Sequence, residues 1–197
     1  MKAALRLCGA ALLALSCAAC GPAAPKFQGS DVTGVGFGRD FKLVDHNGKP
    51  RTLADFRGKV VVMFFGYTQC PDVCPTTMAE LATVMQQLDA DAGRVQVLFV
   101  TVDPERDTAE LLSQYVPAFN PTFLGLRGDA EATADVAKEF KILYQKQPGS
   151  TPGSYTVDHS AGTFLFDPQG RLRVYLSYGQ GPDAFAHDIR ELLKVTS

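Results

Sequence analysis

Residues 59–67 read KVVVMFFGY, a continuous apolar run rich in β-branched and aromatic side chains. Such a run is typical of a central strand in an α/β sheet, because helices cover both of its faces. The run leads directly into residues 68–75, TQCPDVCP, which hold two cysteines. It therefore predicts a buried strand whose carboxyl end opens on a cysteine pair.

The rest of the chain alternates strand and helix patterns around this segment. A hairpin is expected near its start, where a short strand at 41–44 precedes the tight-turn pair Asn47-Gly48. Helical spacing of apolar residues follows the cysteines. A second buried strand is expected at 95–102. The next helix should begin at a capping box formed by Asp107 and Glu110 and end before Pro117. The elements expected after it are a helix at 129–140, a loop at 147–157, a strand pair at 161–166 and 172–178, and a terminal helix. This order predicts an α/β domain with a mixed central sheet flanked by helices and an N-terminal hairpin extension.

Composition excludes several classes of protein. The chain has 197 residues, a size typical of one domain, and its 46% hydrophobic residues exclude a wholly disordered protein. The formal net charge of −2 argues against a nucleic-acid-binding protein with a basic surface. No apolar run reaches the ~20 residues that a spanning helix needs, which excludes a multi-pass membrane protein.

The first twenty residues have the pattern of a targeting segment. Two basic residues precede an apolar stretch of the length of a signal-peptide core. The sequence AAC around Cys20 resembles the end of a bacterial lipoprotein signal, with Cys17 as a second candidate for lipidation and plain cleavage or an uncleaved anchor as alternatives. We therefore expect a membrane-targeting segment at 1–20, a flexible linker at 21–30, and a domain at 31–197 facing the periplasm or the extracytoplasmic side.

Three of the five cysteines lie within residues 1–20. The other two, Cys70 and Cys74, lie four residues apart where the strand is expected to pass into a helix. In a helical segment that spacing puts both sulfurs on one face, and a helix N-terminus favours thiolate. Thiolates are soft ligands that select copper(I) or zinc. A redox-active pair fits the same pattern equally well, whereas a structural disulfide would close only a small loop.

Two thiolates leave a metal under-coordinated, so a third donor is expected. The chain has three histidines. His46 lies in the predicted turn and His187 in the terminal helix, where a solvated side chain is the simpler interpretation. His159 follows the loop at 147–157 and precedes a strand, a position from which a side chain can reach a neighbouring site.

Three motifs carry a resemblance to a known family. The chain resembles the Sco/SenC family over roughly residues 30–195, because it has three motifs in the order and at the spacing found in that family. The motifs are CPDVCP at 70–75, TVDPERDT at 101–108 and VDHS at 157–160. The resemblance implies a thioredoxin-like fold and a membrane-tethered copper protein. It also implies a role in assembling the binuclear copper centre of cytochrome c oxidase, with the copper-bearing oxidase subunit as partner and other periplasmic copper carriers as further partners.

Carried over by motif, the family's ligands for one copper ion are Cys70, Cys74 and His159. Three functions stay open: copper delivery, thiol–disulfide exchange with Cys70 and Cys74 as the redox pair, and a thiol peroxidase reaction. Asp103 follows the second buried strand. Its simpler role is to cap and turn the chain together with Pro104; the alternatives are that it steers the partner, binds through a water or orients His159.

Overall fold

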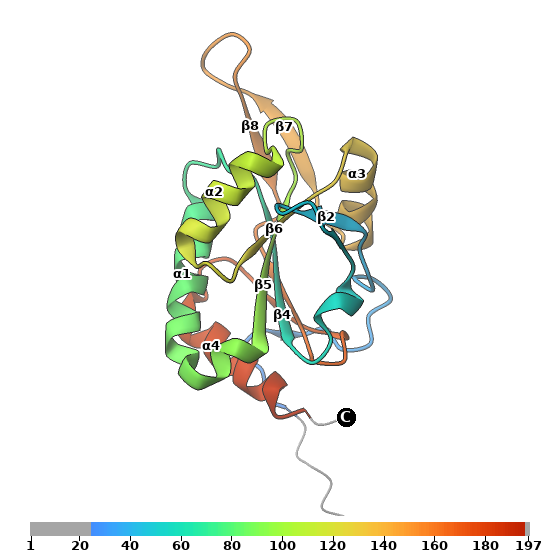
Figure 1. The fold of residues 1–197 in the computed structure, drawn as a ribbon, viewed down its shortest axis with the longest axis vertical. Helices are drawn as coiled ribbons and strands as arrows, with labels where there is room; N and C mark the ends of the chain where they lie inside the picture. The colour runs from blue at the N-terminus through green and yellow to red at the C-terminus, as the bar shows by residue number, and fades with distance from the viewer. Residues whose placement is uncertain (1–24, 196–197) are drawn as a thin grey trace, which may run out of the picture.

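The computed structural model describes residues 25–195 (Figure 1). The predicted targeting segment, with Cys17 and Cys20, lies outside the described residues. Among the described residues, no helix combines the length and the apolar character needed to cross a membrane.

A mixed sheet forms the centre of the domain, as the sequence predicted. Its three central strands, which correspond to residues 60–66, 95–101 and 124–127, are parallel and lie side by side, and two later strands continue the sheet in antiparallel pairing. Within residues 25–195 the eight strands of this sheet are, in spatial order, β1 (Ser30–Asp31), β10 (Leu172–Leu176), β9 (Thr163–Phe166), β4 (Val60–Gly66), β5 (Val95–Thr101), β6 (Leu124–Arg127), β2 (Leu43–Asp45) and β3 (Pro50–Arg51).

Helices cover both faces of the sheet. Figure 1 shows α1 (Val73–Leu88) and α4 (Gly181–Leu193) packed together on one side and α3 (Ala130–Glu139) on the other. The helical elements are η1 (Leu53–Phe56), α1 (Val73–Leu88), η2 (Asp89–Arg94), α2 (Ala109–Phe119), α3 (Ala130–Glu139) and α4 (Gly181–Leu193). Every residue of β4 and β5 is buried, which is why these strands read as unbroken apolar runs. The carboxyl end of β4 is therefore a rigid support for the loop that carries Cys70.

Helix α2 differs from its prediction at both ends. Its N-cap is Thr108, whose hydroxyl accepts a hydrogen bond from the Leu111 N–H, whereas Asp107 points inward. The helix also continues through Pro117 to Phe119. Val116 is fully buried and Phe119 packs against the core, so burial of this face extends the helix past the proline.

The prediction of a loop at 147–157 is wrong at both ends, because strands occupy residues 144–148 and 155–159. Strand β7 (Tyr144–Pro148) and strand β8 (Tyr155–His159) pair antiparallel and project from the domain as a two-stranded sheet of their own (Figure 1). The Gly149 N–H donates to the Ser154 carbonyl at 2.8 Å and closes the tip. The strands were missed because β7 has no buried residue and therefore no apolar pattern.

The expected linker at 21–30 does not extend as far as residue 30. The backbone N–H groups of Gln28 and Gly29 donate to the two carboxylate oxygens of Asp188, each at 2.8 Å, and β1 pairs with β10. Asp188 lies on α4 and is fully buried. A buried carboxylate with two backbone donors holds this segment against the domain, which the Pro/Gly/Ala composition of 21–30 did not indicate.

The Asp188→Asn variant should be less stable than the wild type and bind copper equally well. An asparagine offers one carbonyl oxygen, so one buried N–H loses its acceptor at a cost of about 1–3 kcal/mol. Thermal unfolding should report a melting temperature lower by roughly 2–10 °C. Asp183→Asn is the matched control, because Asp183 is exposed on the same helix. An Asp188→Asn melting temperature equal to that of the control would contradict the assigned role.

Candidate metal centre

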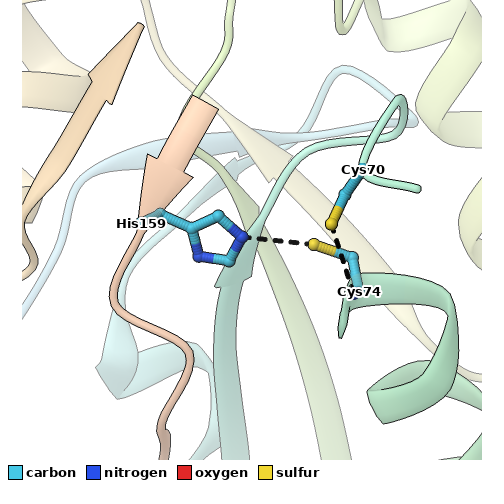
Figure 2. Close-up of side chains that lie close together, drawn as sticks. All are labelled: Cys70, Cys74 and His159. Carbon is cyan, nitrogen blue, oxygen red and sulfur yellow. Dashed lines mark hydrogen bonds between the residues drawn. The ribbon is translucent and has the colours of Figure 1, made fainter. Parts of the chain in front are cut away.

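Two cysteines and a histidine converge at the carboxyl end of the central strands. Cys70 lies in the loop after β4, Cys74 in the first turn of α1 and His159 at the end of β8, and their side chains point toward one another (Figure 2). The Cys70 Sγ, the Cys74 Sγ and a ring nitrogen of His159 all lie within 4.8 Å of one another. Within residues 25–195, no other group of three His, Cys, Asp or Glu side chains meets as closely.

The start of α1 places the two sulfurs on one side. Pro75 is the third residue of the helix, where a backbone N–H would have no partner within the helix, so the proline costs no hydrogen bond. The Cys74 N–H instead faces the Cys70 Sγ at 3.5 Å. The sulfur of Cys70 thus lies at the N-terminal end of α1, next to a backbone N–H of its first turn.

His159 presents the nitrogen that a metal needs. Its Nδ1 lies 3.0 Å from the Ser160 carbonyl oxygen, which can only accept, so Nδ1 carries the proton. The other nitrogen, Nε2, then keeps its lone pair and faces the Cys74 Sγ at 3.3 Å. Burial lowers the pKa of His159, which keeps the imidazole neutral and able to act as a ligand.

Cys74 is the buried member of the pair. Its side chain is 0% exposed, and burial raises the pKa of its thiol well above the usual range. The thiol therefore keeps its proton in the absence of metal and donates it toward the His159 Nε2. Both Cys70 and Cys74 are free thiols rather than a disulfide.

Aromatic rings and an open cavity surround the three ligand atoms. The ring of His159 packs edge-on against Phe64 and Tyr67, with centroids 6.3 and 5.9 Å away. A cavity of about 430 Å³ lies beside the site and reaches Cys70 and His159. Its lining comes from residues 67, 70–73, 156–159 and 161. The aromatic rings therefore hold His159 in place from the protein interior, and the cavity leaves Cys70 and His159 accessible from outside.

A buried carboxylate anchors the loop that carries Cys70. The carboxylate of Asp107 is fully buried and accepts hydrogen bonds from the Thr68 hydroxyl at 2.6 Å, from the Thr68 N–H, and from the Thr101 hydroxyl. Burial raises the pKa of Asp107, while these donors act in the opposite direction. The spacing of Asp107 and Glu110 predicted a helix cap and gave no sign of this link to the cysteine loop.

The other two histidines and Asp103 do not supply a donor atom to this group of three. His46 is half-buried and its Nδ1 accepts the Gly125 N–H at 3.0 Å, a structural contact rather than a solvated turn. His187 bonds Asp188 at 2.8 Å. Asp103 is 1% exposed and bonds the side chains of Tyr155 and Arg106, so it does more than turn the chain.

The topology and the site together define a class of protein. A parallel pair β4–β5 continued by antiparallel β9 and β10, with a cysteine pair at the start of the helix after β4, is a thioredoxin-like fold. The histidine on β8 distinguishes this domain from one that carries a dithiol alone.

Comparison with known proteins identifies the family. A model of the SCO1/SenC family matches residues 31–194, and this chain belongs to that family. The mitochondrial SCO2 homologue of Bos taurus is 42% identical over 153 residues, which cover 77% of this chain and 58% of that protein. The chain thus matches less than two thirds of the length of this relative.

Solved structures show the same similarity. ScoI of Bradyrhizobium japonicum with copper bound is 38% identical, with a TM-score of 0.72 over 78% of this chain and 98% of that one. The apo Sco1 protein of Thermus thermophilus is 42% identical, with a TM-score of 0.75 over 87% and 99% of the two chains. Similarity of this extent places the whole described domain within the Sco fold.

Proposed function

We propose that this protein is a copper metallochaperone that binds one copper ion through Cys70, Cys74 and His159. The observation that carries the proposal is the convergence of these three donor atoms within 4.8 Å of one another at an accessible edge of the sheet. The copper-bound relative from Bradyrhizobium japonicum supports copper as the metal.

The donor set suits copper(I). Two soft thiolates and one neutral imidazole satisfy a three-coordinate copper(I) ion, whereas copper(II) prefers a further oxygen or nitrogen donor. Cys74 and His159 are held from the inner side by buried neighbours, and Cys70 lies beside the cavity. This arrangement keeps the ion from bulk solvent while leaving one thiolate within reach of an acceptor.

Membership of the SCO1/SenC family supports a proposal for the partner. We propose that the chain delivers copper to the copper-bearing subunit of cytochrome c oxidase, after receiving it from other periplasmic copper carriers. We further propose that the domain faces the periplasm from a membrane attachment at its N-terminus. Transfer of copper from the loaded protein to the purified copper-binding domain of that oxidase subunit tests the partner.

Copper counting tests the proposed site. The reduced protein is loaded with copper(I) without oxygen, challenged with a strong chelator, and analysed for copper per chain. We expect one retained copper in the wild type and none in Cys70→Ser or His159→Ala. Failure of the wild type to retain copper would overturn the proposal.

Copper uptake should release the proton of Cys74. Burial raises the pKa of this thiol, so it is protonated at neutral pH and must deprotonate to bind the metal. Protons are then a product of binding, and copper affinity should rise with pH by about tenfold per unit for each proton released. Calorimetry in buffers of different ionisation enthalpy measures the protons released. An affinity that does not change with pH would contradict this assignment.

Thiol–disulfide exchange is the second candidate, favoured by two free thiols, one of which lies beside the cavity. In that reaction Cys70 and Cys74 lose two electrons and two protons and form a disulfide, and the target's disulfide is reduced to two thiols. His159 has no bond to form in this step. Reductase activity should therefore survive His159→Ala, whereas copper retention should not.

A further inference from the structure

The strand that carries His159 is separate from the central sheet. Strands β7 and β8 form their own two-stranded sheet, and an isolated hairpin is marginally stable in water. The position of His159 relative to Cys70 and Cys74 therefore depends on side chains that fasten this hairpin to the domain. Several such contacts lie at Tyr155, four residues before His159 on the same strand.

Arg106 joins the two halves of the candidate metal site. One of its guanidinium nitrogens, Nη1, donates both to the Tyr155 carbonyl oxygen at 2.8 Å and to the Gln69 Oε1 at 3.0 Å. Gln69 directly precedes Cys70. A single nitrogen thus bonds the strand of His159 and the loop of Cys70.

The guanidinium of Arg106 is itself fixed in place. Its plane stacks over the Tyr155 ring, with its central carbon 3.6 Å from the ring centroid, and its Nε donates to the Asp103 carboxylate. Asp103 is 1% exposed and also accepts the Tyr155 hydroxyl at 2.8 Å. Because these bonds close a ring of three residues, none of the three can turn without breaking contacts of the other two.

We propose that Arg106 is a positioning residue that sets the distance between His159 and the two cysteine sulfurs, and so sets how tightly copper is held. The inference rests on the proposed function. Loss of the latch formed by Arg106, Asp103 and Tyr155 lets the hairpin swing outward and removes the imidazole from the site. The two thiolates alone then hold the ion less tightly and release it faster.

The Arg106→Lys substitution keeps the positive charge and removes the planar set of guanidinium N–H donors. One ammonium group cannot bond Asp103, Tyr155 and Gln69 with the geometry of a guanidinium. We expect Arg106→Lys to weaken copper(I) binding by about 10- to 100-fold, the range typical of residues that orient a metal ligand. Arg127→Lys is the matched control, because Arg127 bonds the carbonyls of Pro104 and Asp107 in the same turn without touching the latch.

A double-mutant cycle with His159→Ala separates positioning from other effects. Affinity is measured by chelator competition in the wild type, in Arg106→Lys, in His159→Ala and in the double variant. If Arg106 acts through His159, the lysine substitution has no further effect once the imidazole is gone. Equal weakening in both backgrounds, or no weakening in either, would overturn the proposal.

Hydrogen exchange of the metal-free protein gives a readout that does not depend on copper. We expect the amides of 155–159 to exchange faster in Arg106→Lys than in the wild type, and those of Arg127→Lys to match the wild type. Unchanged exchange in Arg106→Lys would overturn the proposal that Arg106 fastens the hairpin to the domain. If the wild type retains no copper, the proposed function fails, and the exchange data still decide whether Arg106 fastens the hairpin.

Discussion

The Cys74→Ser variant should lose copper(I) affinity by at least about 100-fold. Structural zinc sites of four ligands bind with about 10–16 kcal/mol, and the same scale assigns on the order of 3 kcal/mol to each ligand here. A serine hydroxyl is a hard donor and does not replace a thiolate toward copper(I). Cys74 also faces both other ligands, since its sulfur lies 3.3 Å from His159 Nε2 and its N–H faces the Cys70 Sγ.

Competition with a copper(I) chelator measures this loss. Ala79→Ser is the control, because it introduces the same side chain at an exposed position of the same helix. We expect the control to bind as the wild type does. Retention of wild-type affinity by Cys74→Ser would exclude Cys74 as a ligand and leave the site without its central donor.

The Gly66→Ala variant should lose both stability and copper affinity. A Cβ atom at position 66 would lie 2.8 Å from the Cys74 Sγ and 3.0 Å from the rings of Phe64 and Phe99. These neighbours are fully buried, so the structure must shift to admit the methyl group. Overpacking of this kind costs about 1–3 kcal/mol, or roughly 2–10 °C in melting temperature.

The effect on copper follows from the direction of the clash. Moving the Cys74 sulfur disturbs the ligand set directly, and Phe64 also packs against His159. We expect copper(I) affinity to fall by about tenfold or more. Gly93→Ala is the control, because nothing lies within 4 Å of a Cβ built there. Equal melting temperatures and affinities in the two alanine variants would show that Gly66 is not needed for space.

The cysteine half of the site could be predicted from sequence because its determinants are local. The apolar run at 59–67 fixes a buried strand, and Pro75 is compatible only with a loop or a first helical turn. Two cysteines four residues apart then fall at one helix N-terminus. The structure confirms both the strand and the start of α1.

The histidine half depended on contacts that are distant in sequence. His159 lies at the end of a hairpin whose strands have little apolar pattern, and its approach to Cys74 spans 85 residues of chain. The residues alone left its role open, and the resemblance to the Sco/SenC family named it as a ligand.

The role of Asp107 was missed for a similar reason. Asp107 and Glu110 have the spacing of a capping box, and this local pattern competes with hydrogen bonds from Thr68 and Thr101 that only the folded chain provides. Asp107 is free to accept these buried hydrogen bonds because the hydroxyl of Thr108 caps the helix in its place. Local spacing could not distinguish these two arrangements.

X-ray absorption spectroscopy at the copper edge of the copper(I)-loaded wild type measures the ligand set itself. We expect one copper bound by two sulfur atoms and one imidazole nitrogen, with the nitrogen contribution lost in His159→Ala. A site with sulfur ligands alone in the wild type, or a spectrum unchanged by His159→Ala, would contradict it.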